Sequence, residues 1–556
     1  MAKTAKKAKA SVSVSQNNPK FSLWNFWVSG TLLKLLLIPG YFSTDFDVHR
    51  NWLAITNKLP LKLWYVEDTS QWTLDYPPFF AYFEWFLSQV VPKVVQKDGC
   101  LDIVKVGRFG MPTVIFQRLT VIASETLLYV VLQVFINKSE MTDRSANFVV
   151  ASSIVLSPGF LIIDHIHFQY NGFLFAILIA SIVAAKHQKY LQCALFFTIA
   201  LCFKHIFLYL APSFFVFLLR VYVLDFSNFK FRSYNDLISV VQWKNLLKLG
   251  GVVVTVFTAC FAPFIAQWPQ LLKRLFPFSR GLTHAYWAPN FWAIYSLLDK
   301  VLTLCVMKVP YVHRFLSQFI GPPLIPETLA EIQSRLQQYN GGTKGLVQDV
   351  SFVILPQVQP KLTFFLTLFY QVLALVPVLF SPSFKRFIGS LTLCGFASFL
   401  FGWHVHEKAI MLVIIPFSFL VTSDRRLLTP FLLAVSAGYV SLFPLLHSSQ
   451  EFLLKILYTL VWSIVYSLAL RQVTKISSSV QRRVFFFDRF ALFYIIMLLP
   501  LVIGVQLLEA LKWRYSVLQK FEFAGLMIYS IYCSIGILSS WVGLSWLYNF
   551  DEPLWM

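Results

Sequence analysis

The polar stretch Phe-Gly-Trp-His-Val-His-Glu-Lys occupies residues 401–408, between two apolar segments long enough to cross a bilayer. Its ionisable side chains are His404, His406, Glu407 and Lys408. A charge at the bilayer centre costs at least about 2.5–3.5 kcal/mol, so we expect this cluster at a membrane face or in a wet cavity. The cations suit the phosphate head of a lipid carrier. A proton relay in a transporter would use the same residue types.

Two carboxylates, Asp45 and Asp47, follow directly after the first apolar segment. A carboxylate at the membrane surface can act as a general base. Ser43, Thr44 and Asp45 are also residue types preferred at a helix N-cap, so the residues alone leave catalysis and capping open.

A third carboxylate, Asp75, precedes Tyr-Pro-Pro, and the two prolines hold the residues before them extended. Asp75 is thereby held at a fixed turn. It can contact a substrate, or it can bond nearby backbone amides as turn carboxylates do.

The segment Asp-His-Ile-His-Phe-Gln-Tyr-Asn-Gly begins at Asp164. The spacing of Asp164, His165 and His167 hints at a metal, but residues two apart on a helix do not converge and the segment supplies no third ligand. A polar substrate wall or a turn network is favoured, and no metal is expected. The chain has neither a Gly-x-x-x-x-Gly-Lys loop nor a Rossmann glycine pattern, so no nucleotide cofactor is expected either.

Two isolated cations, Lys204 and Arg280, are predicted near the same membrane face as the 404–408 cluster. Arginine binds phosphate oxygens bidentately and lysine offers a point charge. Each residue taken singly fits snorkelling to lipid headgroups equally well.

These residues must be positioned by membrane helices. The chain of 556 residues is 57% hydrophobic, 17% aromatic and 13% charged, and shows no alternating barrel pattern, which predicts an all-α polytopic membrane protein. About fourteen segments approach the length of a membrane-spanning helix; they lie near residues 23–42, 113–136, 146–163, 172–186, 190–203, 206–223, 249–267, 361–381, 386–403, 408–422, 427–446, 451–470, 489–510 and 522–547.

Basic loops predict the orientation. The Lys-rich and Arg-rich connections fall on one side, which we assign to the cytosol together with a basic disordered tail at 1–22 and a short C-terminus at 551–556. The single membrane domain, 23–550, then places two large loops, 43–112 and 268–360, in the lumen together with the polar motifs. The apolar stretch 291–308 is interpreted as a lumenal or re-entrant helix, because counting it as a span would move residues 404–408 to the basic side.

The single sequon, Asn137-Lys138-Ser139, falls on the predicted cytosolic side. Seven cysteines are scattered singly, which predicts neither a disulfide framework nor a metal centre.

Five motifs in this order resemble one known family: Thr-Asp-Phe-Asp-x-His-Arg-Asn-Trp, Trp-Thr-Leu-Asp-Tyr-Pro-Pro, Asp-His-x-His-Phe-Gln-Tyr-Asn-Gly, Phe-Pro-Phe-x-Arg-Gly and Val-His-Glu-Lys. The family is the dolichyl-phosphate-glucose-dependent α-1,3-glucosyltransferases of the endoplasmic reticulum. The stretch His-Ala-Tyr-Trp-Ala-Pro-Asn-Phe-Trp, with Trp-His before Val-His-Glu-Lys, resembles the member that adds the second glucose.

The resemblance implies a C-type glycosyltransferase (GT-C) fold and an inverting glucosyl transfer without a metal or cofactor. The donor would be dolichyl-phosphate-glucose, and the acceptor the lipid-linked oligosaccharide Glc1Man9GlcNAc2-PP-dolichol, which becomes Glc2Man9GlcNAc2-PP-dolichol for protein N-glycosylation. It implies no nucleic-acid partner. Asp45 would be the catalytic base, with Asp47 not excluded.

The resemblance also implies two groups of binding residues. Those expected at the donor phosphate are His406, Lys408, Arg280 and His404. Those expected at the substrates are Asp47, Asp75, Asp164, His167, Gln169, Lys204, His284, Trp287, Asn290 and Glu407.

Two alternatives stay open at this point. The sister enzyme of the family adds the first glucose to Man9GlcNAc2-PP-dolichol. A lipid or sugar transporter would use similar polar residues, but it predicts polar or broken helices at mid-membrane, often in repeated halves, and neither is clear in the chain.

Overall fold

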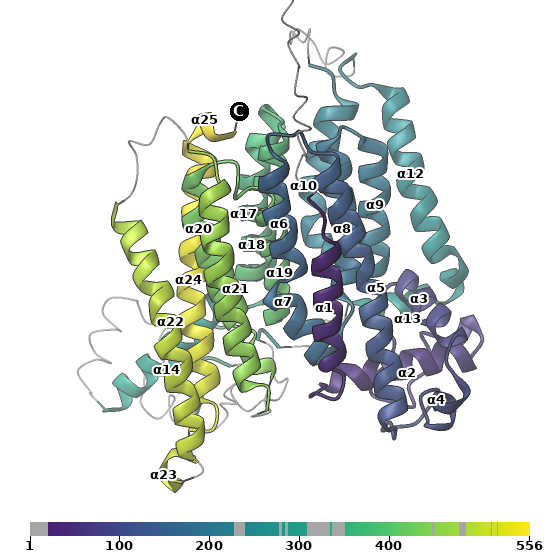
Figure 1. Cartoon of the computed structure of the whole chain (residues 1–556), viewed down its shortest axis with the longest axis vertical. Coiled ribbons are helices and arrows are strands. Elements are labelled where there is room, and N and C mark those ends of the chain that lie inside the picture. The colour runs from purple at the N-terminus through teal and green to yellow at the C-terminus, as the bar shows by residue number, and fades with distance from the viewer. Residues whose placement is uncertain are drawn as a thin grey trace, which may run out of the picture.

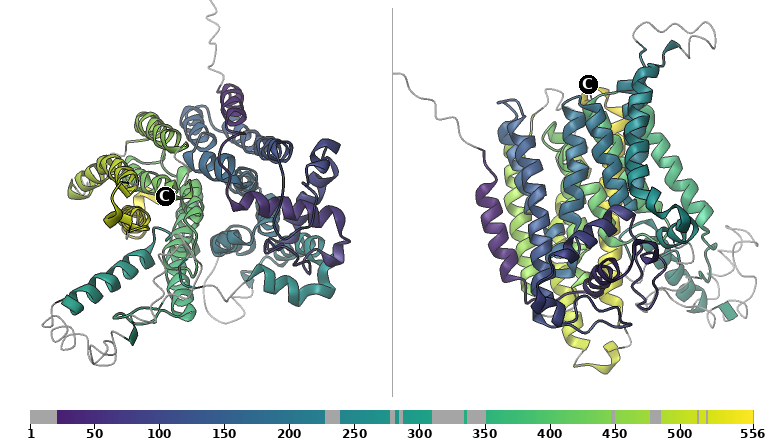
Figure 2. Two further views of the ribbon diagram at one scale, coloured as in Figure 1. Left: turned by 90° about the horizontal axis from the view of Figure 1, so that it is seen from below. Right: turned by 90° about the vertical axis from the view of Figure 1, so that its right-hand side faces the viewer.

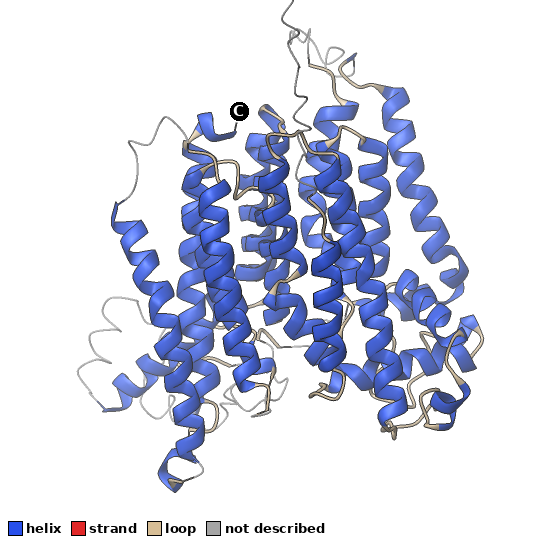
Figure 3. Ribbon diagram, in the orientation of Figure 1, coloured by secondary structure: helices blue, strands red, loops and turns tan. Residues whose placement is uncertain are grey.

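The computed structural model describes residues 21–226, 239–276, 281–283, 287–308, 334–335, 351–446, 450–476, 485–512, 514–519 and 521–555. Within these ranges the chain is helical and contains no β-strand (Figure 3). Two isolated bridges, Leu224 with Val241 and Thr283 with Val405, are the β-type pairings among the described residues. The predicted all-α class is confirmed.

Most helices run along one common direction and form a bundle (Figure 1). The bundle helices of the first half are α1 (Trp24–Leu36), α5 (Met111–Asn137), α6 (Arg144–Val155), α7 (Pro158–Phe160), η2 (Leu161–Phe168), α8 (Asn171–Lys186), α9 (Tyr190–Phe203), η3 (His205–Leu210), α10 (Ala211–Leu218), η4 (Leu219–Val223) and α12 (Trp243–Phe261). Those of the second half are α17 (Pro360–Phe380), α18 (Phe384–Phe401), η6 (Glu407–Ile410), α19 (Met411–Ser418), η7 (Arg425–Leu427), α20 (Leu428–Val440), η8 (Phe443–Leu445), α21 (Phe452–Val473), α22 (Phe485–Lys512) and α24 (Ala524–Phe550).

Shorter elements cover the ends of this bundle. At the lower end in Figure 1 lie α2 (Thr44–Lys58), η1 (Leu61–Leu63), α3 (Pro78–Gln89), α4 (Lys93–Lys97), η5 (Ala262–Gln267), α13 (Trp268–Leu275), α14 (Phe291–Lys308) and α23 (Ser516–Gln519). The upper end carries α25 (Glu552–Trp555). We call these the α2 end and the α25 end.

Ten helical stretches in the described part of the chain are long and apolar enough to span a membrane. Each coincides with one of the predicted spans. A helix also lies over each of the four remaining predicted segments, but α1, α8, α9 and α19 are shorter than a full crossing, at 13, 16, 14 and 8 residues. For α1 the cause is local, since Pro39 and Gly40 follow soon after its end.

The α25 end of the bundle carries several ion pairs. At the α25 end, basic residues pair with acidic ones: Lys475 with Asp143 at 2.9 Å and Arg426 with Asp424 at 2.9 Å. Arg386 reaches Glu552 at 3.5 Å. The polar motifs instead gather at the α2 end, as the next subsection describes.

The helix α14 is the apolar stretch that the sequence placed outside the span count. It is not among the ten candidate spans, and Asp299 and Lys300 interrupt its apolar surface. Figure 1 shows it lying across the α2 end beside α24, and the view from below shows it projecting from the bundle (Figure 2). Asp299 accepts backbone N–H bonds from Val353, Ile354 and Leu355 at 2.8–3.0 Å, which ties this helix to the segment preceding α17.

Candidate functional site

The first turn of α2 brings Asp45 to the centre of the site. Ser43 caps this helix, because its Oγ accepts the backbone N–H of Asp45 at 3.1 Å. Ser43 also donates from Oγ and from its backbone N to the carbonyl of His167, at 2.6 and 3.1 Å. The capping function therefore belongs to Ser43, which leaves the carboxylate of Asp45 available for other contacts.

Three donors from two distant parts of the chain converge on Asp45. Its Oδ2 accepts from Gln169 Nε2 at 2.5 Å and from Lys408 Nζ at 2.8 Å, and it lies 3.2 Å from His167 Nε2. Every partner of this carboxylate among the described residues bonds Oδ2, and a quarter of the side chain stays exposed to solvent. Oδ1 is thus the oxygen left to receive a proton.

The electrostatics of this cluster keep Asp45 ionised. Burial raises the pKa of the carboxyl, but the Lys408 ammonium and the His167 imidazole lower it by more, so the pKa lies well below its ordinary value. An acceptor that stays ionised at neutral pH meets the first requirement of a general base.

Asp47 has a different environment, although it lies only two residues along. Its Oδ1 accepts from Arg50 Nε at 2.6 Å, and its Oδ2 accepts the backbone N–H of Gly107 at 3.3 Å. Arg50 is fully buried and also donates to the carbonyl of Asp102 at 2.7 Å. A Cβ at Gly107 would lie 2.2 Å from the Asp47 carboxylate, so the close approach requires glycine. Asp47 therefore fastens the loop that follows α4.

Asp164 is the buried cap of α8. It accepts the backbone N–H of Asn171 at 3.0 Å and that of Gly172 at 2.6 Å, together with the side-chain amide of Asn171 at 2.9 Å. Asn171 also donates to Gln169 Oε1 at 2.8 Å. A continuous chain of hydrogen bonds thus runs from Asp164 through Asn171 and Gln169 to Asp45.

Lys204 reaches the same network from the turn after α9. Its Nζ donates to Asn171 Oδ1 at 3.1 Å and lies 5.1 Å from the centre of the Tyr76 ring. Burial lowers the pKa of Lys204 to about 8; Lys408 lowers it too, while Asp164, Asp45 and Asp75 act in the opposite direction. Asp75 therefore lies within the electrostatic reach of Lys204.

The other residues of the 404–408 turn have separate functions. The backbone N of His404 donates to Leu282 at 2.9 Å, and its Nδ1 donates to the carbonyl of Gly281 at 2.8 Å. The His406 ring is 5.7 Å from that of His404. Glu407 is 2% exposed, and burial raises its pKa. His404 thereby holds the segment that follows Arg280 against this turn.

Four predicted residues lie elsewhere or outside the described ranges. Arg280 and His284 belong to the undescribed residues. Trp287 is 4% exposed, and its carbonyl accepts from Ser530 of α24 at 2.6 Å. Asn290 caps α14, accepting from the backbone N of Trp292 at 3.0 Å, and donates to Phe399 of α18 at 3.2 Å.

Sequence reasoning missed a second buried cluster beside the site. Glu125 of α5 accepts from His165 Nε2 at 2.8 Å and forms an ion pair with Lys34 of α1, all three being at most 6% exposed. Arg118 lies two helical turns before Glu125 in α5 and is 3% exposed. The sequence did offer a signal, because Arg118 and Glu125 are charged residues within an otherwise apolar span. A charge in a span is costly in lipid and therefore indicates a functional or packing role. Asn171 was also not singled out.

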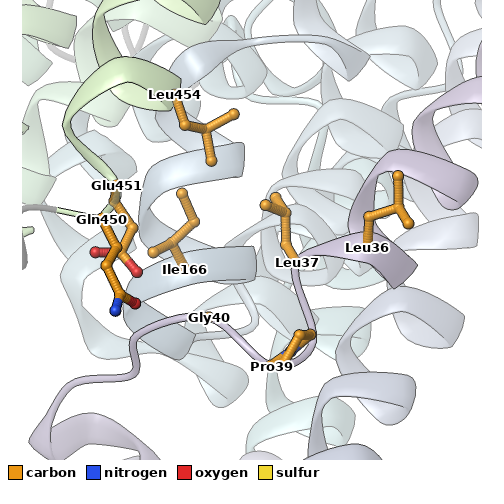
Figure 4. A pocket seen from close by; sticks show the side chains of 8 residues that line it. All are labelled: Leu36, Leu37, Pro39, Gly40, Ile166, Gln450, Glu451 and Leu454. Carbon is orange, nitrogen blue, oxygen red and sulfur yellow. The ribbon is translucent and has the colours of Figure 1, made fainter.

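No group of three or more His, Cys, Asp or Glu side chains in the described ranges is placed to hold a metal ion. One cavity, of about 260 Å³, lies between the end of α1 and the start of α21 (Figure 4). It is lined by Leu36, Leu37, Pro39, Gly40, Ile166, Gln450, Glu451 and Leu454. Asp45 does not line it.

Residues 30–544 match the model of the ALG6, ALG8 glycosyltransferase family. The chain belongs to this family. The match covers every motif from which the resemblance was inferred, and it confirms the predicted family.

Several relatives of this ALG6, ALG8 family chain carry the name dolichyl pyrophosphate Glc1Man9GlcNAc2 alpha-1,3-glucosyltransferase. That of Saccharomyces cerevisiae is 70% identical over 98% of this chain and 95% of its own length. That of Candida glabrata is 70% identical over 98% of this chain and 99% of its own length. That of Kluyveromyces lactis is 72% identical over 96% of this chain and 95% of its own length.

Proposed function

We propose that this chain transfers glucose from dolichyl-phosphate-β-glucose to Glc1Man9GlcNAc2-PP-dolichol, giving Glc2Man9GlcNAc2-PP-dolichol by an inverting α-1,3 transfer. The observation that supports this proposal most directly is the identity of about 70%, over nearly the full length, to enzymes named for that acceptor. The helical bundle with its polar motifs at one end supports assignment to the GT-C fold with about fourteen crossings.

Asp45 is the proposed catalytic base. Its Oδ1 takes the proton of the acceptor glucose 3-hydroxyl while that oxygen attacks C1 of the donor glucose. The bond between C1 and the phosphate oxygen breaks, and dolichyl phosphate leaves. Because the leaving group is an already ionised phosphate, the reaction needs no general acid, and a single base suffices. The engagement of Oδ2 by three donors fixes the direction in which Oδ1 points.

Lys408 is the proposed link between the base and the donor phosphate. Its ammonium already lies against Asp45, and His406 precedes it by two residues in the same turn. A preorganised cation at the departing phosphate lowers the barrier because negative charge develops there as the C1–O bond breaks. Arg280, which directly precedes the His404 partner Gly281 in the sequence, is proposed to add a bidentate contact to the phosphate.

Sugar hydroxyls are proposed to bind the polar wall beside Asp45. Gln169, Lys204 and Asp75 surround this wall, and the Tyr76 ring supplies a flat apolar face. His167 holds the base in place. Asp47 and Asp164 are proposed to act on the shape of the wall, since their oxygens already accept hydrogen bonds from Arg50 and from backbone N–H groups.

The α2 end is proposed to face the lumen of the endoplasmic reticulum, with both termini in the cytosol. The basic residues at the α25 end support this orientation, because short cytosolic loops are enriched in lysine and arginine. The donor and acceptor lipids would then approach Asp45 from the lumenal leaflet.

The deciding experiment is a transfer assay with purified full-length protein, dolichyl-phosphate-glucose and lipid-linked acceptors bearing zero or one glucose, run beside Asp45→Asn. Transfer only to the monoglucosylated acceptor, lost in the variant, supports the proposal. Transfer to the unglucosylated acceptor would instead make the chain the sister enzyme. No transfer to either acceptor would refute the transferase assignment and favour transport.

A further inference from the structure

Arg118 is a buried cation whose bonds go to the backbone. Its guanidinium donates to the carbonyl oxygens of Tyr41 at 2.7 Å, Ile166 at 3.2 Å and Gly40 at 3.5 Å, and also to that of His165. Among the ion pairs between described residues it takes part in none. A buried charge is costly unless hydrogen bonds replace its hydration, and here backbone carbonyls perform that function.

The carbonyls that Arg118 binds belong to two segments, and each segment leads to a group at Asp45. Residues 40 and 41 lie in the connection from α1 to α2, a few positions before Asp45 itself. Residues 165 and 166 lie in η2, immediately before His167, one of the partners of Asp45. Figure 4 labels Gly40 and Ile166 among the residues that line the cavity. Arg118 therefore links the 40–41 segment, which leads to Asp45, to the 165–166 segment, which leads to His167.

Two further contacts act on the same connection. Glu451 of the turn before α21 accepts the backbone N–H of Tyr41 at 2.9 Å, so Tyr41 is bound through its N–H and its carbonyl. Ser43 bonds the carbonyl of His167 directly, from its Oγ and from its backbone N–H. Of Arg118, Glu451 and Ser43, only Arg118 belongs to a third helix, α5, and contacts both segments.

We propose that Arg118 is a positioning residue for the glucosyl transfer: it holds the 40–41 and 165–166 segments at the separation that keeps Asp45 against His167, Gln169 and Lys408. The proposal rests on the proposed function. It assigns Arg118 no contact with a substrate. Its effect is on the geometry of the base, where a displacement of about 1 Å can cost about a hundredfold in rate.

The chemistry of the site requires arginine in particular. A guanidinium presents five N–H donors in a rigid planar fork, whereas a lysine ammonium offers three on a flexible stem. Four carbonyls on two segments can be bridged by the fork. Lysine would keep the charge but would release part of this set, so Arg118→Lys should loosen one segment.

The test compares Arg118→Lys and Arg118→Met with the matched control Arg386→Lys. Arg386 is also a buried arginine, 8% exposed, that donates to two carbonyls, those of Pro377 and Ser381, both at 3.3 Å, but it lies at the α25 end. Each purified protein is assayed for kcat, for KM of donor and acceptor, for the pH dependence of kcat/KM, and for its melting temperature. The wild type and Asp45→Asn in the same assay establish the transfer reaction itself.

The expected result for Arg118→Lys is a kcat at least about tenfold lower with both KM values within about twofold, as for an interaction expressed mainly in the transition state. Weaker contact of Asp45 with its cations should also raise the acidic half-activity pH by about one unit. The titratable groups facing Asp45 are His167, Lys408, Lys204, Glu407 and Tyr76, and all are unchanged in this variant. Arg386→Lys should lower the melting temperature without moving the profile.

An unchanged pH profile and kcat in a folded Arg118→Lys would overturn the proposal, as would an equal profile shift in Arg386→Lys. If both Arg118 variants fail to fold, Ser43→Ala decides instead. It removes the Oγ bond of Ser43 to the carbonyl of His167 and leaves the backbone N–H bond in place, and the proposal requires an upward shift of the acidic limb here too. A wild type inactive on every acceptor would refute the proposed function, an outcome distinct from these.

Discussion

The Nζ of Lys408 lies 2.8 Å from Oδ2 of Asp45, although 363 residues separate them in the chain. The contact joins the first turn of α2 to η6, the short helix that precedes α19. It places a cation suited to the donor phosphate directly beside the proposed base. The two halves of the chain therefore each contribute one residue to the proposed reaction centre.

Asp45→Asn should lower kcat by about 10²–10⁴, because the amide cannot accept the hydroxyl proton. Asp47→Asn should keep most of the rate but lower the free energy of unfolding by about 1–2 kcal/mol, since Asp47 binds Arg50 and Gly107. Single-turnover transfer and thermal unfolding of both variants provide the measurement. A larger rate loss for Asp47→Asn than for Asp45→Asn would assign the base to Asp47.

Lys408→Met should shift the acidic limb of kcat/KM to higher pH. The Lys408 ammonium contributes to the low pKa of Asp45, so its removal raises that pKa, and protonation then inactivates the base at a higher pH. Activity measured between pH 4 and about pH 8 gives the direction and size of this shift of the acidic limb. We expect a shift of about one pH unit or more. Lys385→Met, at the opposite end, is the control and should leave the profile in place.

Lys204 should produce a basic limb near pH 8. Its pKa is lowered to about 8, so above that pH it loses the proton with which it holds Asn171. Lys204→Arg stays charged to a much higher pH. Whatever the maximum activity of this variant, its activity should fall at a higher pH than that of the wild type. Profiles that decline identically in both proteins would assign the basic limb to another group.

Asp164→Ala should destabilise the protein by more than about 2 kcal/mol, because it leaves buried N–H groups of Asn171 and Gly172 without their acceptor. Asp164→Asn keeps one acceptor oxygen and should lose less. Thermal unfolding in detergent, with donor binding measured alongside, tests this order. Equal melting temperatures for the wild type and Asp164→Ala would contradict the capping function.

Glycosylation mapping tests the orientation. Glu67→Asn places an asparagine two residues before Thr69 and completes a sequon in the loop at the α2 end. We expect a glycan at that position and none at Asn137, whose sequon lies at the end of α5. Mass shifts removable by endoglycosidase report both sites. A glycan at Asn137 would reverse the proposed orientation.

The sequence predicted where the helices lie because apolar length alone marks them, and every predicted span coincides with a helix. It also brought Asp45, His167, Gln169 and Lys408 to one end of the bundle. It did not separate Asp45 from Asp47. Both oxygens of Asp47 are engaged, one by Arg50 on the same helix and the other by Gly107, which reaches Asp47 only through tertiary folding.

Two other limits have the same origin. Asp164 has the composition of a substrate ligand, but its hydrogen bonds go to Asn171 and Gly172 seven and eight residues later. Arg118 and Glu125 were hidden within a long apolar span, and their partners come from α1 and η2, so no local pattern announces them.

The segment Leu161–Phe168 is wound as a π-helix, with Phe168 at a φ of +89° closing it. Each residue of an α-helix turns by about 100°, so removing one residue here would rotate Asp164 and His165 away from their partners. We therefore expect the length of this segment to be more strongly constrained than its side chains. Single-residue insertions and deletions between Ser157 and Asn171 should therefore be the least tolerated of any in the membrane bundle, and an alignment of family members should be free of gaps across this interval.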